Sequence, residues 1–565
     1  TPLHRATDAA PEVVAYLLEH GADVHAETES GSTALTMFTH SIPPETVQLL
    51  IDYGADVNHR SEPDDDTALH EAVSNIAVMQ VLIDNGADVN AHGFMGETAL
   101  QRTTGELYSG MIPDDPDDPA EIARFLVSSG AEVDARNDHN RTPLMQCTDP
   151  ALIAVLIELG ADVNARDDEG DTVLHQHCDR WAQDPAVLET LIAHGAQIEA
   201  LDDDGNTPLH TAIGNQNDMA VAVLREAGAT VDLAAAAGLN ESETLSQFYR
   251  QSGYVEAHPG EATRAITLAA INGHVQVVDD LLAQGARPTL CDMARLGYIG
   301  EMRKLIDSGA DVNEVIGNRD TPLNYAAAYG QNEAVRLLVE SGADLNGHGY
   351  RNRTPIACAT RDDHFDTLRL LLELGADPDE PVFFGGTALH WATDYESARA
   401  LIDAGADINA RSDDGRTPLM HAVQTSQSLR RGDTGVVQLL IDSGADLDLQ
   451  DDRGSAAVHE AVGIGPDVSN QPLRQILEAG ATPDLVNELG FTPLWWAVAM
   501  GNQDAVKLLL EHGADPNFTS EWGGTAMLAA AQAGDDELME LLRKHGAEEP
   551  SEEALSLLAA PDGML

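Results

Sequence analysis

Residues 321–346 read TPLNYAAAYGQNEAVRLLVESGADLN, and their apolar residues follow the spacing of two short amphipathic helices. Apolar residues at positions i, i+3 and i+4 lie on one face of a helix and form a buried stripe there. Two such sets occur in this stretch, Leu323, Ala326 and Ala327 in the first helix and Val335, Leu338 and Val339 in the second. The stretch therefore predicts a pair of helices joined by a short turn.

The ends of both helices carry residues that start and stop helices. Thr321 is suited to cap the first helix, and Pro322 to its first position, where a missing N–H costs nothing. Gly330 ends the first helix, and Gly342 ends the second as a left-handed cap. Each helix has only about ten residues, fewer than the roughly 12–15 that an isolated helix needs in water. Neighbouring units must therefore supply the burial.

The stop signal, Gly-Ala followed by a short extended stretch, recurs along the whole chain. The step is 33 residues from Gly309 to Gly342 to Gly375, and again from Gly480 to Gly513 to Gly546. The copies lie at Gly21, Gly54, Gly86, Gly130, Gly160, Gly195, Gly228, Gly285, Gly309, Gly342, Gly375, Gly405, Gly444, Gly480, Gly513 and Gly546. A fixed period of this length indicates a stack of repeats.

A second signal, Thr-Pro-Leu-His or a close variant, precedes the first helix at Thr1, Thr67, Thr207 and Thr387. With about sixteen copies of the stop signal in register, the sequence resembles the ankyrin-repeat family over essentially its whole length. The resemblance implies a mainly α fold: an α-solenoid of sixteen to seventeen stacked helix pairs joined by short β-hairpins. It also implies a concave face of hairpin tips and first helices that binds other proteins.

The charge of the chain excludes some classes of partner. The sequence has 95 acidic and 31 basic residues, a net charge of −64, and its only lysines are Lys304, Lys507 and Lys544. Such a surface repels phosphate backbones and anionic lipids. We therefore expect neither nucleic acid nor a membrane as a partner.

The sequence leaves the origin of this acidity open. The balance resembles that of proteins from salt-loving organisms, where multimolar salt shortens the screening length to roughly 3 Å or less. A genome that prefers Arg codons, combined with an Asp in every repeat, would give a similar balance. An acidic mimic of DNA is a third explanation.

Other features of the sequence concern its compartment. No run of 18 or more uncharged apolar residues occurs, so no membrane span is expected. Cys147, Cys178, Cys291 and Cys358 are too few and too scattered for a disulfide framework, which favours a reducing interior. The beginning, TPLHRATDAA, has no initiating Met or signal peptide and looks truncated. We expect a cytoplasmic monomer, although a lost targeting signal is left open.

The repeat pattern breaks between Gly228 and Gly309, where the steps are 57 and 24 residues and the Thr-Pro-Leu-His start is absent. This segment is expected to hold degenerate repeats that either continue the stack or form a bend. The predicted organisation is an N-terminal array with a truncated first repeat over 1–230, degenerate repeats over 231–308, a C-terminal array over 309–549, and a capping helix and tail over 550–565.

Two insertions lengthen single repeats, residues 105–121 and 425–435. Both fall between the two helices of their repeat, so solvated loops are expected. The second insertion carries Arg430 and Arg431, a basic pair in an acidic chain. At the C-terminus, Ser551 is suited to cap the last short helix and so to cover the end of the stack.

Histidines can bind metals or act in catalysis. In this chain, however, they recur at the fourth position of the Thr-Pro-Leu-His start, as His4, His70, His175, His210 and His390. That regularity favours hydrogen bonding between neighbouring repeats, as the resemblance implies. The tightest cluster, His175, His177 and Cys178 with Cys147 one repeat earlier, lacks the converging geometry that zinc requires.

Other chemistry is not indicated. The Asp-rich stretch LDDDGNT (201–207) lacks the ligand spacing of a calcium loop, and no phosphate-binding loop, nucleophile elbow or isolated carboxylate pair occurs. The sequence therefore predicts no enzyme activity, no catalytic residues, no metal and no cofactor.

The candidate binding residues are exposed positions whose type varies while the framework stays fixed. The hairpin tips lie three and four residues before the Thr that starts the Thr-Pro-Leu-His motif, which we call the framework Thr. Most tips are acidic, but several carry aromatic or Arg side chains. Such side chains are the usual anchors of interfaces. Trp495 replaces the usual His and is expected in the core. The predicted partner-binding residues are Phe94, Met95, Tyr325, Tyr329, Tyr350, Arg351, Phe383, Phe384, Trp391, Tyr395, Phe491, Trp496, Met500 and Trp522.

Most of these residues lie from residue 310 onward, which predicts an aromatic ridge on the C-terminal array, rimmed by acid. The alternative is that several rings pack against adjacent hairpins. The leading functional hypothesis is a non-enzymatic scaffold that binds partner proteins. The alternative is a targeting or regulatory arm of a larger protein whose catalytic or membrane domain lies upstream.

Overall fold

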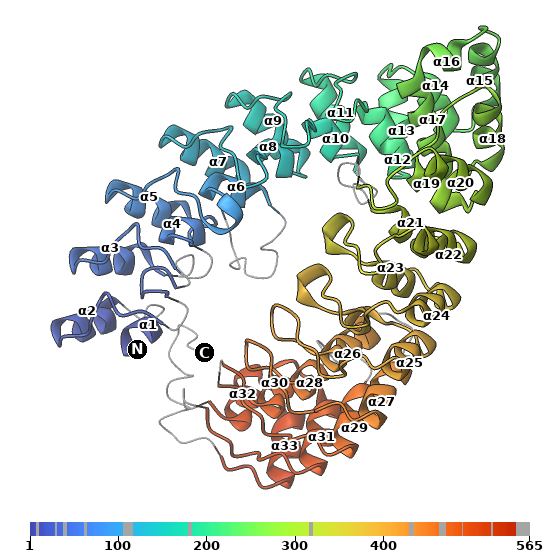
Figure 1. The fold of residues 1–565 in the computed structure, drawn as a ribbon. Helices are drawn as coiled ribbons and strands as arrows, with labels where there is room; N and C mark the ends of the chain where they lie inside the picture. Colours follow the sequence, from blue (N-terminus) through green and yellow to red (C-terminus); the bar gives the residue numbers. More distant parts are fainter. Residues whose placement is uncertain are drawn as a thin grey trace. The chain divides into compact units, whose positions relative to one another are not determined.

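The computed structural model describes residues 1–6, 11–28, 31–37, 42–61, 65–105, 117–178, 184–315, 320–428, 434–462, 470–488, 490–520 and 524–549. They form two compact units, residues 1–286 and a second unit that begins at Arg287. Within each unit the helices stand in consecutive pairs, each pair beside the next (Figure 1). Within these ranges, no helix is both long enough and apolar enough to cross a bilayer.

Several predicted features lie outside the described residues. These are Trp522, the C-terminal segment 550–565 with Ser551, residues 106–116 of the first insertion and residues 429–433 of the second.

Within its described residues, the first unit consists of α-helices and one short 3-10 helix, η2. Its elements are α1 (Pro2–Arg5), α2 (Pro11–Glu19), α3 (Pro44–Asp52), α4 (Ala68–Glu71), α5 (Ile76–Asp84), η2 (Phe94–Gly96), α6 (Ala99–Thr104), α7 (Pro119–Ser128), α8 (Pro143–Gln146), α9 (Pro150–Glu158), α10 (Val173–Gln176), α11 (Pro185–Ala193), α12 (Pro208–Gly214), α13 (Asp218–Glu226), α14 (Leu233–Gly238), α15 (Ser242–Tyr249), α16 (Tyr254–Ala257), α17 (Pro259–Ile271) and α18 (Val275–Ala283).

The second unit continues the same alternation of a first and a second helix. Its elements are α19 (Leu290–Leu296), α20 (Ile299–Asp307), α21 (Pro322–Ala328), α22 (Asn332–Glu340), η4 (Tyr350–Asn352), α23 (Pro355–Arg361), α24 (Phe365–Leu374), η5 (Phe383–Gly385), η6 (Ala388–Trp391), α25 (Tyr395–Asp403), α26 (Pro418–Ser428), α27 (Gly435–Asp442), α28 (Ala457–Glu460), α29 (Gln471–Glu478), α30 (Pro493–Ala499), α31 (Gln503–Glu511), α32 (Ala526–Ala533) and α33 (Asp536–Lys544).

The predicted helix ends are confirmed in α21 and α22. The hydroxyl of Thr321 accepts the N–H of Asn324 at 3.1 Å, and Pro322 occupies the first helical position. Gly342 has a φ of +94°, and the N–H of Ala343 after it donates to the carbonyl of Leu338 at 2.9 Å. A left-handed residue at this place closes the helix and turns the chain away from its axis.

The predicted stripes are buried, with one difference. Leu323, Ala326 and Ala327 of α21 and Val335 and Leu338 of α22 have almost no exposed surface. Val339 is only half-buried, whereas Leu337 is buried. An internal helix contacts repeats on both sides, so its buried surface extends beyond a single i, i+3, i+4 stripe.

The Asn that ends the repeated Gly-Ala-Asp-Val-Asn phrase joins one repeat to the next. The side chain of Asn58 donates to the carbonyl of Gly86 at 3.0 Å and accepts the N–H of Asp88 at 2.8 Å. Asn90 forms the same pair of bonds with Gly130 and Glu132 at 3.0 and 2.8 Å. Each copy of the phrase thus binds the next copy, which explains why it is repeated in register.

Where the structure describes them, the connections between repeats follow a hairpin path and contain no extended strand. Within the described residues the only β-type pairings are isolated bridges, such as Arg166 with Thr172. The tips are instead linked along the stack by backbone hydrogen bonds, such as that from the N–H of Asp413 to the carbonyl of Phe384 at 2.9 Å. The Gly and Asp residues of these tips favour tight turns over long ladders.

The segment 231–308, where the repeat pattern breaks, is helical. It contains α14 to α20, and the division between the two units falls inside it, between Ala286 and Arg287. Each of the two units is therefore a row of helix pairs in its own right. The assignment of 231–308 as a separate middle segment stays a prediction.

We expect Gly342→Ala to lower the free energy of unfolding by about 1 kcal/mol, because a Cβ disfavours the left-handed conformation. No atom lies within 4 Å of the added Cβ, so the effect reports on the backbone alone. Gly300→Ala is the matched control, since Gly300 lies inside α20 with equal space around its Cβ and should gain stability. Urea unfolding midpoints measure both, and equal effects would contradict the role of Gly342.

Candidate functional site

Several first helices begin with a clamp of Thr and His that also holds the next repeat. In the repeat that begins at Thr387, Nδ1 of His390 accepts the backbone N–H of Thr387 at 2.9 Å. Nε2 of the same ring donates to the carbonyl oxygen of Arg416, in the following repeat, at 3.1 Å. Both ring nitrogens are therefore engaged, and burial lowers the pKa of His390.

The same clamp recurs, and the structural role expected for these histidines is confirmed. Nε2 reaches the following repeat at 3.1 Å from His4 to Ser32, from His70 to Glu97 and from His175 to Asn206. In one repeat Gln101 replaces the His: its amide oxygen accepts the N–H of Thr98 at 3.0 Å and its amide nitrogen donates to the carbonyl of Arg141 at 2.9 Å.

A possible metal cluster among the described residues is Asp171, His175 and Asp202, whose potential ligand atoms lie within 4.8 Å of one another. His175 is not free to ligate there, because Nδ1 accepts the N–H of Thr172 and Nε2 contacts the carbonyl of Asn206, both at 3.1 Å. The cluster does not include His177, Cys178 or Cys147. Burial also raises the pKa of Cys147 to about 12, which keeps it a thiol.

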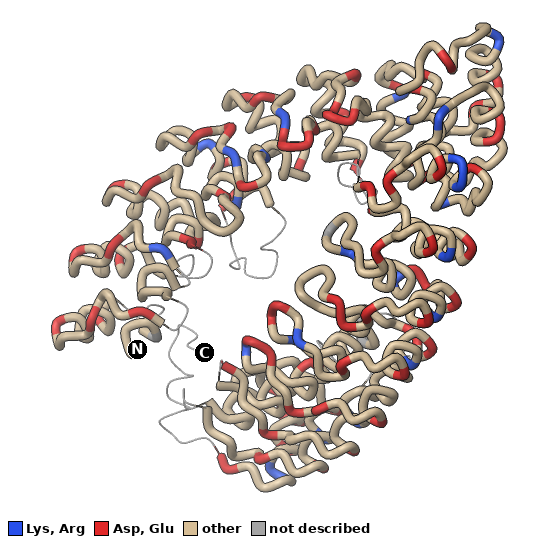
Figure 2. Tube along the Cα trace, in the orientation of Figure 1, with Lys and Arg blue, Asp and Glu red and all other residues tan. Residues whose placement is uncertain are grey.

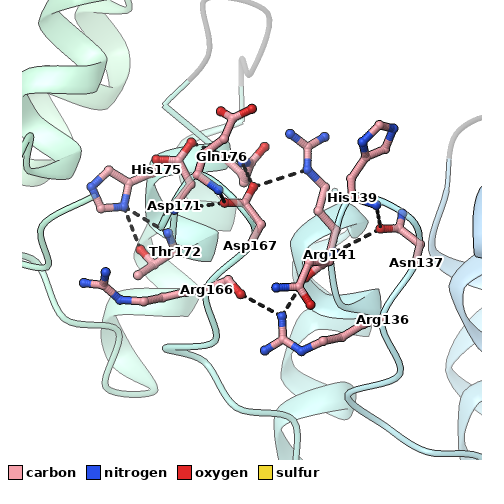
Figure 3. A network of polar contacts seen from close by, with 12 residues as sticks. Arg136, Asn137, His139, Arg141, Arg166, Asp167, Asp171, Thr172, His175 and Gln176 are labelled. Carbon is pink, nitrogen blue, oxygen red and sulfur yellow. Dashed lines mark hydrogen bonds and ion pairs between the residues drawn. The ribbon is translucent and has the colours of Figure 1, made fainter. Parts of the chain in front are cut away.

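A polar network surrounds this cluster and orders the tip of its repeat (Figure 3). Asp167 is buried and accepts the N–H groups of Glu169 and Asp171 at 3.0 and 2.9 Å and the side-chain amide of Gln176 at 2.7 Å. The guanidinium of Arg136, one repeat earlier, donates to the carbonyl of Arg166 at 2.7 Å. Hydrogen bonds of this network run between adjacent tips, so the network is part of the framework.

The predicted partner-binding side chains divide into exposed and half-buried ones. The exposed ones are Phe94, Met95, Tyr329, Tyr350, Phe384 and Tyr395. The half-buried ones are Tyr325, Phe383, Trp391, Phe491, Trp496 and Met500. Arg351 lies in η4, and Trp522 lies outside the described residues.

Two exposed tip residues have a backbone conformation that large side chains rarely adopt. Met95 and Phe384 both have a φ of +55°, three residues before the framework Thr. A non-Gly residue in the left-handed region costs about 1 kcal/mol. Phe384 in addition leaves 64% of its surface in solvent. Folding alone gives no reason for a phenylalanine at this position.

The ring of Phe384 belongs to a group of aromatic side chains that we call the aromatic cluster: Phe383, Phe384, Trp391 and His421. Ring centroids lie 3.9 Å apart for Phe383 and Phe384, 6.3 Å for Phe383 and Trp391, and 5.3 Å for Trp391 and His421. Burial lowers the pKa of His421 to about 4, assisted by the proximity of His390 and by the positive charge of Arg416, so its ring is neutral at pH 7. The cluster joins one tip to two successive first helices.

Other predicted rings are packed against framework residues. The Arg295 guanidinium lies 4.4 Å from the ring of Tyr325 and 4.7 Å from that of Tyr329, and it donates to the Tyr329 hydroxyl at 2.6 Å. Phe491 stacks on Trp495 at 3.7 Å. Trp495, expected in the core, is half-buried because this stacking covers only part of it. The ring of Tyr325 thus packs on the neighbouring repeat, whereas the ring of Phe491 packs on the first helix of its own repeat.

The register of the repeats predicts that Tyr395, like Tyr329, belongs to a first helix, and this prediction is wrong. Tyr395 is the first residue of α25, the second helix of its pair. The step from Gly375 to Gly405 is 30 residues and not 33, so this repeat has a first helix of only four residues, η6. Tyr395 follows Thr387 at the same distance as Tyr329 follows Thr321. In this repeat, however, the first helix ends at Trp391, so Tyr395 lies beyond it.

The fourth residue after the framework Thr differs between the two units. In the first unit several repeats hold a polar residue at this position, among them Glu71, Arg102, Gln146 and Gln176, whose side chains bind neighbouring polar groups. In the second unit it includes the aromatic residues Tyr325, Trp391, His421 and Trp496. His421 was missed as a candidate, although its place in register with Trp391 and Trp496 was the signal that could have found it.

The aromatic cluster stands in acidic surroundings. Asp413 donates its N–H to the carbonyl of Phe384, and Asp414 lies beside it on the next tip. Figure 2 shows acidic residues along the described trace of both units and far fewer basic ones. Several arginines are moreover engaged with backbone carbonyls of the next repeat, such as Arg60 with His92 and Arg411 with Gln450, at 2.7 and 2.8 Å.

Comparison with known families agrees with this geometry. A family model described as ankyrin repeats (three copies) matches residues 3–93, 148–235, 290–382, 379–451, 426–520 and 467–553. The chain belongs to the ankyrin-repeat family. Ankyrin repeats are in general protein–protein interaction modules and are typically not catalytic.

A solved structure that is similar to this chain is titled as the ankyrin repeat domain of Bcl-3, a unique member of the IkappaB protein family. The two sequences are 29% identical, and the match covers 40% of this chain and 98% of that one, with a TM-score of 0.35.

We expect His390→Ala to lower the free energy of unfolding by about 2–3 kcal/mol, because it leaves the Thr387 N–H and the Arg416 carbonyl without partners. His390→Gln should retain most of the stability, since Gln101 already makes both bonds elsewhere in the ankyrin array. Chemical denaturation of the two variants at pH 8 measures the difference. Equal losses would contradict the clamp.

The pH dependence of the same variants gives a second readout. A histidine whose pKa is lower in the folded than in the unfolded state destabilises the fold as the pH falls below about 6.5, where the unfolded chain binds the extra proton. His390→Gln should therefore lose less stability than the parent protein between pH 7 and pH 5. An unchanged pH profile would contradict the burial of a neutral His390.

Asp171 should change the free energy of unfolding with pH in the opposite direction. Burial raises the pKa of Asp171 to about 7, assisted by the negative charges of Asp167, Asp202 and Glu169. The folded state therefore holds a proton that the unfolded state has lost, and stability from this group falls as the pH rises from about 4 to about 7. Asp171→Asn should raise the free energy of unfolding at pH 8 by about 1–2 kcal/mol, after allowance for solvent screening of a partly exposed group.

The matched control is Asp168→Asn, because Asp168 is exposed on the same tip and the net charge changes equally. Denaturation midpoints from pH 4 to pH 8 compare the two. A gain at pH 8 of the same size in both variants would show that overall charge, and not the burial of Asp171, is responsible.

Proposed function

We propose that this ankyrin-repeat protein is a non-enzymatic scaffold and that it binds a partner protein at the aromatic cluster and the tips beside it. The observation that carries the proposal is Phe384, which combines an exposed ring with a left-handed backbone. Strain of this kind persists where function requires it. Aromatic side chains on a rigid support are the usual anchors of protein interfaces.

The chemistry of the partner follows from the charges around this cluster. Asp413 and Asp414 border Phe384, and the chain as a whole has a net charge of −64. A partner that inserts an apolar side chain between Phe384 and Trp391, with basic residues around it, complements both features. Opposite charges at the rim accelerate association mainly at low salt, so salt should slow binding more than it speeds dissociation.

Predicted residues at the equivalent positions of other repeats support a wider surface. Tyr350 is an exposed tip residue, and its N–H is held by the carboxylate of Asp320 at 3.0 Å. Trp496 occupies the same first-helix position as Trp391 and is half-buried. In the first unit, Phe94 and Met95 form one comparable exposed tip.

The test is site-specific photo-cross-linking with the full chain. A photoreactive phenylalanine analogue at position 384 should cross-link a partner in extract from the cells that make the protein, whereas the same analogue at Tyr53 should not. Tyr53 is a suitable control because it is exposed but ends a second helix, α3. Cross-linking at both positions alike, or at position 53 alone, would contradict the proposal.

A second arm tests the predicted chemistry of the partner. Trp391→Ala should reduce the yield of cross-linking from position 384 by about tenfold or more, in line with the loss of an interface anchor. Raising the salt from about 0.05 to about 0.5 M should reduce the yield further if basic groups surround the anchor. A yield that neither change affects would place the partner elsewhere.

A further inference from the structure

The short repeat that begins at Thr387 borders a cavity of about 370 Å³. The repeat steps explain its position: the step is 30 residues from Gly375 to Gly405 and 39 from Gly405 to Gly444. A first helix of four residues, η6, is thereby followed by one of 11 residues, α26. Adjacent layers of unequal length leave space where the longer layer has no counterpart.

The wall of this cavity contains two polar atoms without a partner. Ser397 is only 1% exposed, and its hydroxyl makes no hydrogen bond. Asp394 accepts the N–H of Ser397 at 2.8 Å through Oδ1, while its Oδ2 is buried and makes no hydrogen bond. Unsatisfied buried groups cost about 1–3 kcal/mol each, more when they are charged. Both side chains line the cavity, so a ligand in it could supply the missing bonds.

The rest of the lining defines the charge of that ligand. Asp363 and Glu396 add two more carboxylates to Asp394, and no Lys or Arg lies in the described lining. Acceptors therefore predominate, and the complementary ligand is a cation with several N–H donors. Phe365 and Val436 provide an aromatic ring and an apolar wall beside the acids, which suit a cation carried on an alkyl stem.

We propose that this cavity binds a guanidinium or primary ammonium group on an alkyl stem. Such a group occurs on the Arg and Lys side chains of proteins and in free polyamines. Its N–H groups donate to Oδ2 of Asp394 and to the hydroxyl of Ser397, and its stem packs on Phe365 and Val436. The cavity uses no residue of the aromatic cluster, so this proposal stands or falls independently of the proposed function.

The test is a calorimetric titration of the full chain with three probes in about 0.15 M salt. The peptide acetyl-Gly-Arg-Gly-amide should bind with saturation at one site, and the same peptide with citrulline, a neutral isostere of arginine, about tenfold more weakly or worse. Agmatine, a free alkylguanidinium, tests whether the ligand is a free polyamine or the side chain of a protein. Tighter binding of agmatine than of the peptide favours a polyamine, and the reverse favours a protein side chain. Equal binding of the arginine and citrulline peptides would overturn the proposal.

Substitutions distinguish binding of the peptide in the cavity from binding to acidic residues elsewhere on the surface. Ser397→Ala should weaken the arginine peptide about tenfold and leave the unfolding midpoint unchanged or higher, since it removes an unsatisfied hydroxyl. Ala422→Leu, which fills the cavity from α26, should abolish binding. Asp442→Asn is the matched charge control, because Asp442 ends α27 in an exposed position, and it should change affinity less than about twofold. An equal effect of Asp442→Asn and Ser397→Ala would overturn the proposal.

One further variant tests for an occupant from the chain itself. Arg430 and Arg431 belong to the insertion between α26 and α27. If an arginine of this pair fills the cavity, the double variant Arg430→Ala, Arg431→Ala will bind the arginine peptide about tenfold more tightly than the parent protein. That result would overturn the proposal of a ligand from outside, whereas an unchanged affinity supports it.

Discussion

Hydrogen bonds from the side chains of one repeat to the backbone of the next, such as that of a histidine to a carbonyl, are the interactions on which the rest of this structure depends. None of the described helices exceeds the 13 residues of α17, and helices of this length are marginal in water when isolated. Each pair must therefore be held by its neighbours. The His390 ring does this twice, since it closes its own helix at Thr387 and binds the following repeat at Arg416. The Asn of each Gly-Ala-Asp-Val-Asn phrase adds a second link of the same kind.

This framework also clarifies the unusual charge. In a chain with 31 basic residues, Arg60, Arg136 and Arg411 donate to carbonyls of the next repeat and thus hold the tips together. The acids are more often exposed, as Asp168 and Glu169 are. The protein therefore presents a negative surface while much of its positive charge is engaged within the stack. At Phe384 an exposed apolar ring is surrounded by acidic residues, and a partner can recognise this combination of an apolar contact and negative charge.

The fold could be predicted from the sequence because its causes are local and repeated. Caps such as Thr321 and Gly342, and stripes such as Leu323 with Ala326, act within a few residues of themselves. The candidate site was harder to predict, because the surroundings of a side chain depend on the neighbouring repeat. The packing of Tyr325 against Arg295, one repeat earlier, is a contact that no spacing reveals. The cavity beside Ser397 arises from a mismatch between two repeats, and the sequence alone showed only their unequal lengths.

The most direct measurement is the stability of a protein in which the Phe383–Phe384 tip carries the two aspartates found at the next tip, Phe383→Asp with Phe384→Asp. If these rings serve a partner and not the core, the unfolding midpoint should stay within error of the parent value or rise, because Asp tolerates the left-handed backbone better than Phe does. A loss of about 2 kcal/mol or more, the cost of removing buried aromatic surface, would show that the rings stabilise the fold and would contradict a binding role for the aromatic cluster.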